Sequence, residues 1–284
     1  MYIKNEIKKI IPDSLFLRLK YRQKMGRSLH LRNPKTFNEK IQWLKIHDHN
    51  PEYIKMVDKY EVKKYVAEKI GKQYIIPTYG VWDRFEDIDF DSLPERFVLK
   101  CTHDSGGIVI CNDKADLNID EVREKLNNCL QSNYYWYGRE WPYKNLKPRI
   151  IAEKYMSDKP DKDLIDYKFM CFNGEPQIVL VCSDRFGLVG LHEDFYDINW
   201  QHLSISRPDH PNSDNGFTKP LCFDEMLEIA KDLAKDIPFV RIDLYDVKGK
   251  PYFSEITFYP LSGWEAFIPD EWDYKLGLCL KLPE

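Results

Sequence analysis

Apolar residues at the start of the chain recur every three or four positions, which is the spacing of one helix face. From 7 to 25 this pattern is interrupted by Pro12, so it predicts two short helices that end near Gly26. A further helix is predicted from Thr36 through the segment FNEKIQWLKIH. The N-terminal part of the chain is therefore expected to be helical.

The next segment carries a signal for the start of a helix. Asp58 is followed three positions later by Glu61, the spacing of a capping box, and Gly71 marks the end of the helix. We therefore expect Lys59 in a first helical turn.

Beyond Pro77 the pattern changes to short apolar strands. Two of them, FVLKC at 97–101 and IVIC at 108–111, flank the turn THDSGG, which predicts a β-hairpin with a mobile tip. A helix over 119–130 is expected to cover this hairpin, and IIAEKYM at 150–156 is predicted as the next strand.

The remainder of the chain contains two further hairpins. In YKFMCF-NG-EPQIVLV, the Asn173-Gly174 pair predicts a type I′ turn, and a long irregular segment is expected after it. Residues 224–237 return to helical spacing, and the strands FVRIDLYDV and PYFSEITFY are joined by Lys248-Gly249. The sum is a mixed α and β fold with antiparallel hairpins, without internal repeats or a nucleic-acid-binding motif.

Composition narrows the class of protein. Hydrophobic residues make up 43% and charged residues 31% of the 284 residues, as is usual for a soluble protein. No stretch approaches the roughly 20 apolar residues that cross a bilayer, and the N-terminus has charges where a secretory signal is apolar. We therefore expect a cytoplasmic protein without a transmembrane segment.

Cysteine usage and charge distribution add two expectations. The seven cysteines form no CxxC pair and lie mostly in apolar runs, so we expect reduced, buried side chains rather than zinc ligands or disulfides. Residues 1–40 are basic although the net charge of the chain is −4. This asymmetry indicates an anionic partner or only a solvated helix face, and it leaves peripheral membrane contact open.

The last hairpin carries acidic and basic residues at strand spacing. Arg241-Ile-Asp243 is followed across the turn by Glu255-Ile-Thr257. Because side chains alternate along a strand, Asp243 and Glu255 point the same way if the strands are adjacent. Carboxylates are hard ligands for magnesium, and Arg241 beside them would meet developing negative charge. Acids on paired strands are also common as surface residues, so the pattern alone leaves both interpretations open.

A second group of residues suits phosphate. Lys100 ends an apolar strand, and Ser105-Gly106-Gly107 follow within the turn. Backbone amides of a glycine-rich turn can cradle phosphates, and a lysine adds a compact positive charge. The alternative is a lysine that merely extends from the strand end to solvent.

The order of these segments resembles a known superfamily. Asp58-Lys59, FVLK, SGG, IIAEKYM, RID and SEIT follow one another as in the ATP-grasp enzymes. A narrower likeness runs from about Pro12 to the C-terminus. It rests on TFNEKIQWLK, VDKYEVKKYV, FVLKCTHDSGG, YGREW, DYKFMCFNG and FYPLSGWEAF, which are similar to the TupA-like ATP-grasp family, named for teichuronopeptide synthesis.

That resemblance implies an α+β ATP-grasp fold: two α+β lobes with ATP between antiparallel sheets, plus an N-terminal helical extension. The expected division is a helical extension at 1–57, a lobe with the lid hairpin at 58–150, and a lobe with the metal site at 151–284. ATP and Mg²⁺ are the implied cofactors.

The resemblance also implies nucleotide-binding positions. Lys59 and Lys100 would contact the phosphates, 103–107 would form the lid, 153–156 would form the adenine hinge, and Asp166 would bind the ribose. The individual residues are Lys59, Lys100, His103, Ser105, Gly106, Gly107, Glu153, Lys154, Tyr155, Met156, Asp166 and Lys168.

Catalytic and metal-binding positions are implied in the same way. The catalytic groups would be Arg241, Lys100 and Arg185. Asp243 and Glu255 would hold magnesium between the β- and γ-phosphates. Thr257 stands where many ATP-grasp enzymes have asparagine, so it would hold a second magnesium more weakly or through water.

The implied reaction is ADP-producing amide formation. A uronic acid of a surface polysaccharide, or of its precursor, would be activated as an acyl phosphate and joined to an amino acid or another amine. The basic N-terminal helices and the aromatic loop from Tyr134 to Trp141 suit an acidic sugar, because aromatic faces stack on sugars and Arg139 can pair with a carboxylate. Packing against the lid is the alternative for this loop.

Two alternative functions differ from the ligase, one in where the phosphoryl group of ATP ends and the other in using a sugar nucleotide as the donor. An ATP-grasp kinase would leave the phosphoryl group on a sugar hydroxyl. A polysaccharide-cluster glycosyltransferase would use Asp243-x-x-Asp246 or Asp89-x-Asp91 for a sugar nucleotide.

A nucleophilic Cys101 beside His103 is disfavoured, because ATP-grasp ligases work by positioning and charge neutralisation. A non-catalytic nucleotide-binding scaffold would leave the lysines, acids and arginine unexplained.

Overall fold

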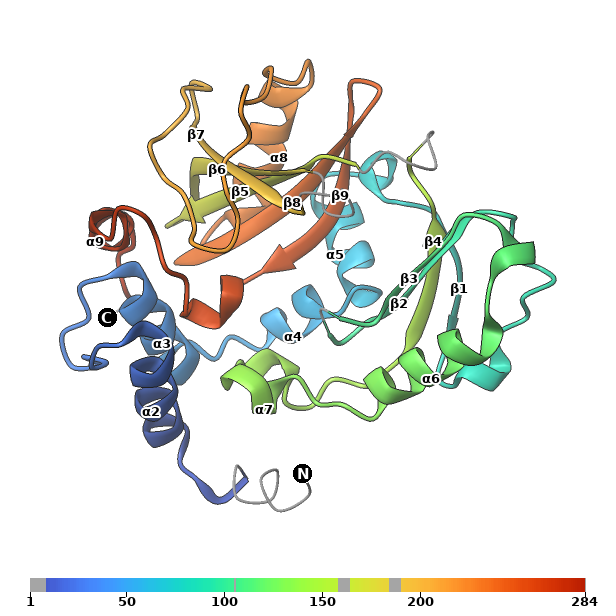
Figure 1. Cartoon of the computed structure of the whole chain (residues 1–284), viewed down its shortest axis with the longest axis horizontal. Coiled ribbons are helices and arrows are strands. Elements are labelled where there is room, and N and C mark those ends of the chain that lie inside the picture. The colour runs from blue at the N-terminus through green and yellow to red at the C-terminus, as the bar shows by residue number, and fades with distance from the viewer. Residues whose placement is uncertain (1–8, 105, 158–163, 184–189, 284) are drawn as a thin grey trace.

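Two antiparallel sheets, each packed against a helix, organise the chain (Figure 1). The computed structural model describes residues 9–104, 106–157, 164–183 and 190–283. The four-stranded sheet has the order β1-β4-β2-β3, and the five-stranded sheet has the order β7-β6-β5-β8-β9.

The four-stranded sheet comes from the first half of the chain. Its strands are β1 (Thr78–Trp82), β2 (Phe97–Cys101), β3 (Ile108–Cys111) and β4 (Ile150–Lys154). The helix α6 (Ile119–Leu130) packs Leu126 into a small core with Phe97 and Leu99 of β2. Because side chains alternate, Val98 and Lys100 lie on the opposite face of the strand.

The five-stranded sheet comes from the second half. Its strands are β5 (Asp166–Phe172), β6 (Glu175–Ser183), β7 (His192–Asp197), β8 (Phe239–Val247) and β9 (Lys250–Thr257). The helix α8 (Phe223–Ala234) covers one face, where the rings of Phe169 and Phe223 lie 5.9 Å apart. Lys168 therefore faces away from α8, and it lies opposite Asp243 in the pairing of β5 with β8.

The remaining helices join the two sheets and cover one end of the larger one (Figure 1). They are α2 (Asp13–Met25), α3 (Phe37–His47), α4 (Glu52–Val57), α5 (Glu61–Lys69), α7 (Tyr135–Gly138) and α9 (Glu271–Cys279). Five 3₁₀ turns are described as well: η1 (Lys72–Tyr74), η2 (Phe85–Asp87), η3 (Lys114–Asp116), η4 (Trp141–Tyr143) and η5 (Pro260–Gly263). In the described ranges, no helix is both long and apolar enough to cross a membrane.

The helix α3 belongs to the core of the five-stranded sheet. Thr36 Oγ1 accepts a hydrogen bond from the Glu39 amide, and the Glu39 carboxylate accepts one from the Thr36 amide, both at 3.2 Å. This capping box satisfies amides at the start of the helix. Phe37 then packs edge-on against Phe239 of β8, with ring centroids 4.9 Å apart. The boundaries proposed at 57 and 150 stay predictions.

Several elements have the predicted bounds. β2, β3 and α6 span the residues expected for them, and α2 ends at Met25 with Gly26 as its C-cap. Asn173 and Gly174 have φ of 52° and 86°, as a type I′ turn requires. Lys248-Gly249 turns the last hairpin in the same way, with φ of 58° and 77°.

The predicted start of α5 was wrong. Asp58 Oδ1 accepts from the Glu61 amide at 3.0 Å, but the Glu61 carboxylate pairs with Arg149 instead of closing a capping box. The helix begins at Glu61, so Lys59 lies in the turn before it. β4 likewise ends at Lys154, two residues before the predicted end.

The irregular segment predicted after the second hairpin contains a strand, β7. Its residues Glu193 and Asp194 are buried, which a pattern of apolar positions does not anticipate. Glu193 pairs with Arg207 at 2.7 Å, and Asp194 pairs with His202 at 2.9 Å. These partners stabilise carboxylates that would otherwise be costly to bury.

We expect Thr36→Ala to lower the free energy of unfolding by about 1 kcal/mol, because it removes the side-chain half of the capping box. Urea denaturation measures this change. Ser14→Ala, at an exposed position of the first turn of α2, serves as the control and should change stability by less than about 0.5 kcal/mol. Equal effects of the two substitutions would argue against the cap as a source of stability.

Candidate active site

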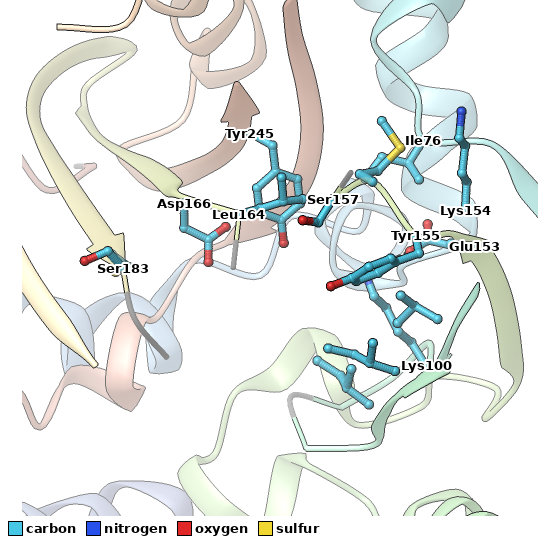
Figure 2. A pocket seen from close by; sticks show the side chains of 15 residues that line it. Ile76, Lys100, Glu153, Lys154, Tyr155, Ser157, Leu164, Asp166, Ser183 and Tyr245 are labelled. Atoms are coloured by element: carbon cyan, nitrogen blue, oxygen red, sulfur yellow. Dashed lines mark ion pairs between the residues drawn. The ribbon is translucent and has the colours of Figure 1, made fainter. Parts of the chain in front are cut away.

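A pocket lies between the two sheets, beside the segment that connects them (Figure 2). Its volume is about 830 Å³, including the part open to solvent. The residues that line it are Ile76, Val98, Lys100, Ile108, Ile110, Glu153, Lys154, Tyr155, Met156, Ser157, Leu164, Asp166, Cys182, Ser183 and Tyr245.

The two sides of the pocket differ in chemistry. The four-stranded sheet contributes the apolar side chains of Val98, Ile108 and Ile110 together with the ammonium of Lys100. The five-stranded sheet contributes Asp166 and Tyr245, which Figure 2 shows across the cavity from Lys100 and Tyr155. Such a pocket suits a ligand with a flat apolar part and a polar or anionic part.

Glu153 is held between two lysines on the side of the four-stranded sheet. It lies opposite Val98 in the pairing of β2 with β4, so Lys100, two residues further, shares its face. Lys100 Nζ lies 2.8 Å from Glu153 Oε2, and Lys63 of α5 contacts Oε1 of the same carboxylate. Burial alone would raise the pKa of Glu153, but the charges of Lys100 and Lys63 outweigh it and lower this pKa to about 2.

Asp243 is the corresponding carboxylate on the five-stranded sheet, where it too is held between two basic side chains. Its Oδ1 accepts from Arg241 Nε at 2.7 Å, and its Oδ2 accepts from Lys168 Nζ at 2.6 Å and from Arg241 Nη2 at 2.7 Å. Burial opposes its ionisation, yet the charges of Arg241 and Lys168 lower its pKa below the ordinary value. Lys168 Nζ also lies 3.3 Å from the carboxylate of Asp166. The buried face therefore holds ionised groups in fixed positions.

Glu255 connects this face to the β2–β3 loop. It lies opposite Asp243 in the pairing of β8 with β9, as the alternation pattern predicted. Its side chain is 30% exposed, and its Oε1 lies 3.6 Å from Lys59 Nζ. Lys59 also donates to the backbone carbonyl of Asp104 in the loop. Lys59, from the turn before α5, is thus brought together with Glu255 and Asp243 of the last hairpin.

The residues Asp243 and Glu255 fit a hard divalent cation. Asp243 Oδ1 accepts one hydrogen bond from Arg241 and retains acceptor capacity, and Glu255 is partly open to solvent. Among the described residues, no third His, Cys, Asp or Glu joins these two in a compact ligand group. The cation would therefore take its remaining ligands from a bound substrate or water, as Mg²⁺ usually does. Thr257 Oγ1 accepts from Arg241 Nη2 at 3.1 Å.

The predicted hinge residues Lys154, Tyr155 and Met156 all line the pocket. The Tyr155 ring lies 4.6 Å from the Arg96 guanidinium. The Lys154 side chain is exposed, and its amide donates to the Pro77 carbonyl at 2.9 Å. Their roles in nucleotide binding stay predictions.

The structure describes His103, Gly106 and Gly107, which were predicted to form part of the lid. His103 is buried, with Nε2 3.0 Å from the Cys129 carbonyl oxygen, and it does not line the pocket. Gly106 and Gly107 lie in the β2–β3 loop, where the Gly107 amide donates to Asp104 Oδ1 at 3.2 Å. Ser105 and Arg185 lie outside the described residues.

Two side chains were misjudged from the sequence. Lys63 was not singled out, although it lies four residues after Lys59 and contacts Glu153. Arg139 was expected to be available for a substrate carboxylate, but it is only 1% exposed. Its guanidinium pairs with Asp13 at 3.2 Å and lies over the ring of Phe16, so it packs the loop against α2.

We expect Glu153→Gln to lower the free energy of unfolding at pH 7 by about 3 kcal/mol, because two largely buried lysines lose their counter-charge. The pKa of Glu153 is lowered on folding, so its contribution is present above about pH 4.5 and is lost as the pH falls towards about 2. Urea denaturation as a function of pH should therefore show a shallower acid loss in Glu153→Gln than in the wild type. Glu124→Gln, at an exposed position of α6, is the matched control, and an unchanged acid profile in Glu153→Gln would contradict the assignment.

Comparisons with known proteins indicate the family to which this chain belongs. The family model described as TupA-like ATPgrasp matches residues 39–281. No curated protein matches the chain. Among solved structures, D-alanine–D-alanine ligase from Bacillus anthracis complexed with ATP shares 18% identity, with 72% of this chain and 55% of that chain covered and a TM-score of 0.40.

Two further structures are similar at the same level. D-alanine–D-alanine ligase from Helicobacter pylori has 14% identity, with 86% of this chain and 69% of that chain covered and a TM-score of 0.45. The RimK domain ATP-grasp protein from Sphaerobacter thermophilus has 9% identity, 81% and 69% coverage, and a TM-score of 0.42. The chain thus spans little more than half the length of the first of these three structures.

The family match covers most of the chain and agrees with its two antiparallel sheets and surrounding helices. The predicted α+β ATP-grasp fold is therefore confirmed, and the match supports an ATP-dependent ligase type of enzyme. The chain belongs to the TupA-like ATP-grasp family.

Proposed function

We propose that the chain is an ATP-dependent carboxylate–amine ligase. It activates a uronic acid of a surface polysaccharide, or of its precursor, as an acyl phosphate, and an amino acid or another amine then displaces phosphate. The observation that carries this proposal is the convergence of Lys59, Glu255 and Asp243 next to the pocket that Lys100 and Asp166 line. The reaction belongs in the cytoplasm, where ATP is available.

The pocket suits a nucleoside triphosphate. Its apolar wall, formed in part by Val98 and Ile110, matches the face of an adenine ring, and Tyr155 and Met156 lie along the same cavity. Asp166, on the opposite side, is an acceptor suited to ribose hydroxyls. Hinge contacts to adenine are expected from the main chain of 153–156.

The phosphates would lie where the basic side chains gather. Lys100 is held on the pocket wall by Glu153, and Lys59 is held between Glu255 and the β2–β3 loop. Because these lysines come from different elements, they reach a polyphosphate from two directions. The carboxylates of Asp243 and Glu255 would hold Mg²⁺, which neutralises phosphate charge when it is bound.

Arg241 and Lys168 would act on the reacting groups. Arg241 is fixed by Asp243 and Thr257 before any substrate arrives, so its guanidinium needs no reorientation to meet developing negative charge. Lys168 lies between Asp166 and Asp243 and would orient phosphate or the acyl group. No protein nucleophile is needed, because the substrate carboxylate itself attacks the γ-phosphoryl group.

An acidic sugar is supported by the family name and by exposed basic residues. Arg18, Arg22 and Lys24 are exposed on α2, and Tyr137, 52% exposed, lies in the aromatic loop. Basic side chains attract a polyanionic substrate, and an exposed aromatic ring can stack on a sugar. With Arg139 buried, recognition of a uronate carboxylate falls to other basic groups.

Product analysis tests this function. The purified chain, ATP, Mg²⁺, a uronate acceptor and a pool of amino acids should yield ADP, free phosphate and an amide detected by mass spectrometry. Hydroxylamine should trap the activated acyl group as a hydroxamate. ADP formed without free phosphate, with the phosphoryl group on a sugar hydroxyl, would exclude the ligase. Thermal stabilisation by a UDP-sugar but not by ATP would exclude the nucleotide site as well.

We expect Glu255→Gln to lower turnover by at least ~100-fold, because the carboxylate acts on charge in the transition state. Its side chain is partly exposed and makes one long ion pair, so the free energy of unfolding should change by less than about 1 kcal/mol. Steady-state kinetics and urea denaturation measure the two effects. Glu228→Gln, at an exposed position of α8, is the matched control, and near-wild-type turnover in Glu255→Gln would remove this residue from the site.

A further inference from the structure

Two cysteines and a carboxylate meet at the base of the β2–β3 loop, outside the pocket described above. Cys101 ends β2, Cys129 lies in the last turn of α6, and Asp104 lies in the loop. The two sulfur atoms and a carboxylate oxygen of Asp104 all lie within 4.8 Å of one another. This is the one compact group of three ligand-bearing side chains among the residues that the structure describes.

The packing around the thiols leaves no room for another side chain. A Cβ atom placed on Gly107 would lie 2.8 Å from the sulfur of Cys129 and 3.1 Å from that of Cys101. The first contact is shorter than a real Cβ atom makes and the second is unusually tight, so glycine at 107 lets the backbone pass directly beside both sulfur atoms. The thiols are therefore held together by the loop that also carries Asp104.

The imidazole of His103 lies beside this group but is not part of it. His103 is 3% exposed, and its Nδ1 has no hydrogen-bond partner in the described part of the chain. Its Nε2 lies 3.0 Å from the carbonyl oxygen of Cys129, the residue that supplies one of the thiols. A buried polar atom without a partner commonly marks the place of a water molecule or an ion.

We propose that Cys101, Cys129 and Asp104 form a binding site for a thiophilic divalent cation of the Zn²⁺ type. Two thiolates and one carboxylate are three of the four ligands that a tetrahedral zinc ion takes, and water would supply the fourth. Soft sulfur ligands favour Zn²⁺ over Mg²⁺, so this site and the carboxylates of Asp243 and Glu255 select different cations.

A cation at this site would restrain the β2–β3 loop. The Asp104 backbone carbonyl accepts from Lys59, and its side chain faces the cysteines. A bound cation would tie the β2–β3 loop to the end of α6 and hold the carbonyl that Lys59 contacts. Since the cation binds only the folded chain, it would also raise thermal stability.

Binding should become tighter as the pH rises, because a cation of this type binds thiolates and each cysteine gives up a proton when the cation binds. Cys129 is only partly buried, which leaves the cation a path from solvent.

Metal titration of the full chain tests this site. Metal-free protein, kept reduced by a phosphine, is titrated with Co²⁺ and then with Zn²⁺ against a chromophoric chelator. We expect one equivalent of Co²⁺ with thiolate-to-cobalt charge-transfer absorption, complete displacement by Zn²⁺, and a higher melting temperature with Zn²⁺. Absence of thiolate-to-cobalt absorption would overturn the site.

Matched variants separate this site from other cysteines and carboxylates. Cys129→Ser should weaken Zn²⁺ binding at least ~100-fold and abolish the stabilisation, because even supporting groups of zinc sites contribute 10–100-fold. Cys279→Ser, at a half-buried position of α9, and Glu255→Gln should both retain wild-type Zn²⁺ affinity. Asp104→Asn is the second test of the site should Cys129→Ser not fold. Unchanged Zn²⁺ affinity in a folded Cys129→Ser or Asp104→Asn protein would disprove the assignment.

Discussion

Two buried carboxylates, each held between two basic side chains, fix the polar faces of both sheets. Glu153 lies between Lys100 and Lys63, and Asp243 lies between Lys168 and Arg241. A buried charge is tolerated only where the groups around it compensate the loss of water, and both carboxylates have a lowered pKa for this reason. The pairs with Glu153 also hold α5 and β2 against β4, and the pair of Lys168 with Asp243 joins β5 to β8.

This arrangement explains why the site is charged and yet ordered. Each basic group is held by a carboxylate before any substrate arrives, so anion binding loses little side-chain entropy. Lys59 and Glu255 form a looser pair at 3.6 Å, at the place where the β2–β3 loop meets the five-stranded sheet. The tight pairs thus form a fixed frame, and the looser pair is the part that a phosphate and a cation would rearrange most readily.

Sequence patterns were sufficient wherever the determinants were local. The hairpin of β2 and β3 follows from two apolar runs, and the facing of Asp243 with Glu255 follows from alternation across a glycine turn. Partners brought in from distant elements could not be foreseen: Lys63 reaches Glu153 from a helix, and β4 enters the sheet between β1 and β2. β7 was missed because its buried acids are compensated by Arg207 and His202, which lie later in the chain.

The glycines of the β2–β3 loop illustrate how one motif can serve two purposes. A Cβ atom on Gly106 would meet nothing within 4 Å, so protein packing does not demand glycine there, and a close approach by a ligand remains a sufficient reason. Gly107 is different, because the sulfur atoms of Cys101 and Cys129 already occupy the space that a side chain would need. A phosphate-cradling function of the Ser-Gly-Gly sequence therefore rests on Gly106 within the described residues, whereas Gly107 is required by the thiols behind the loop.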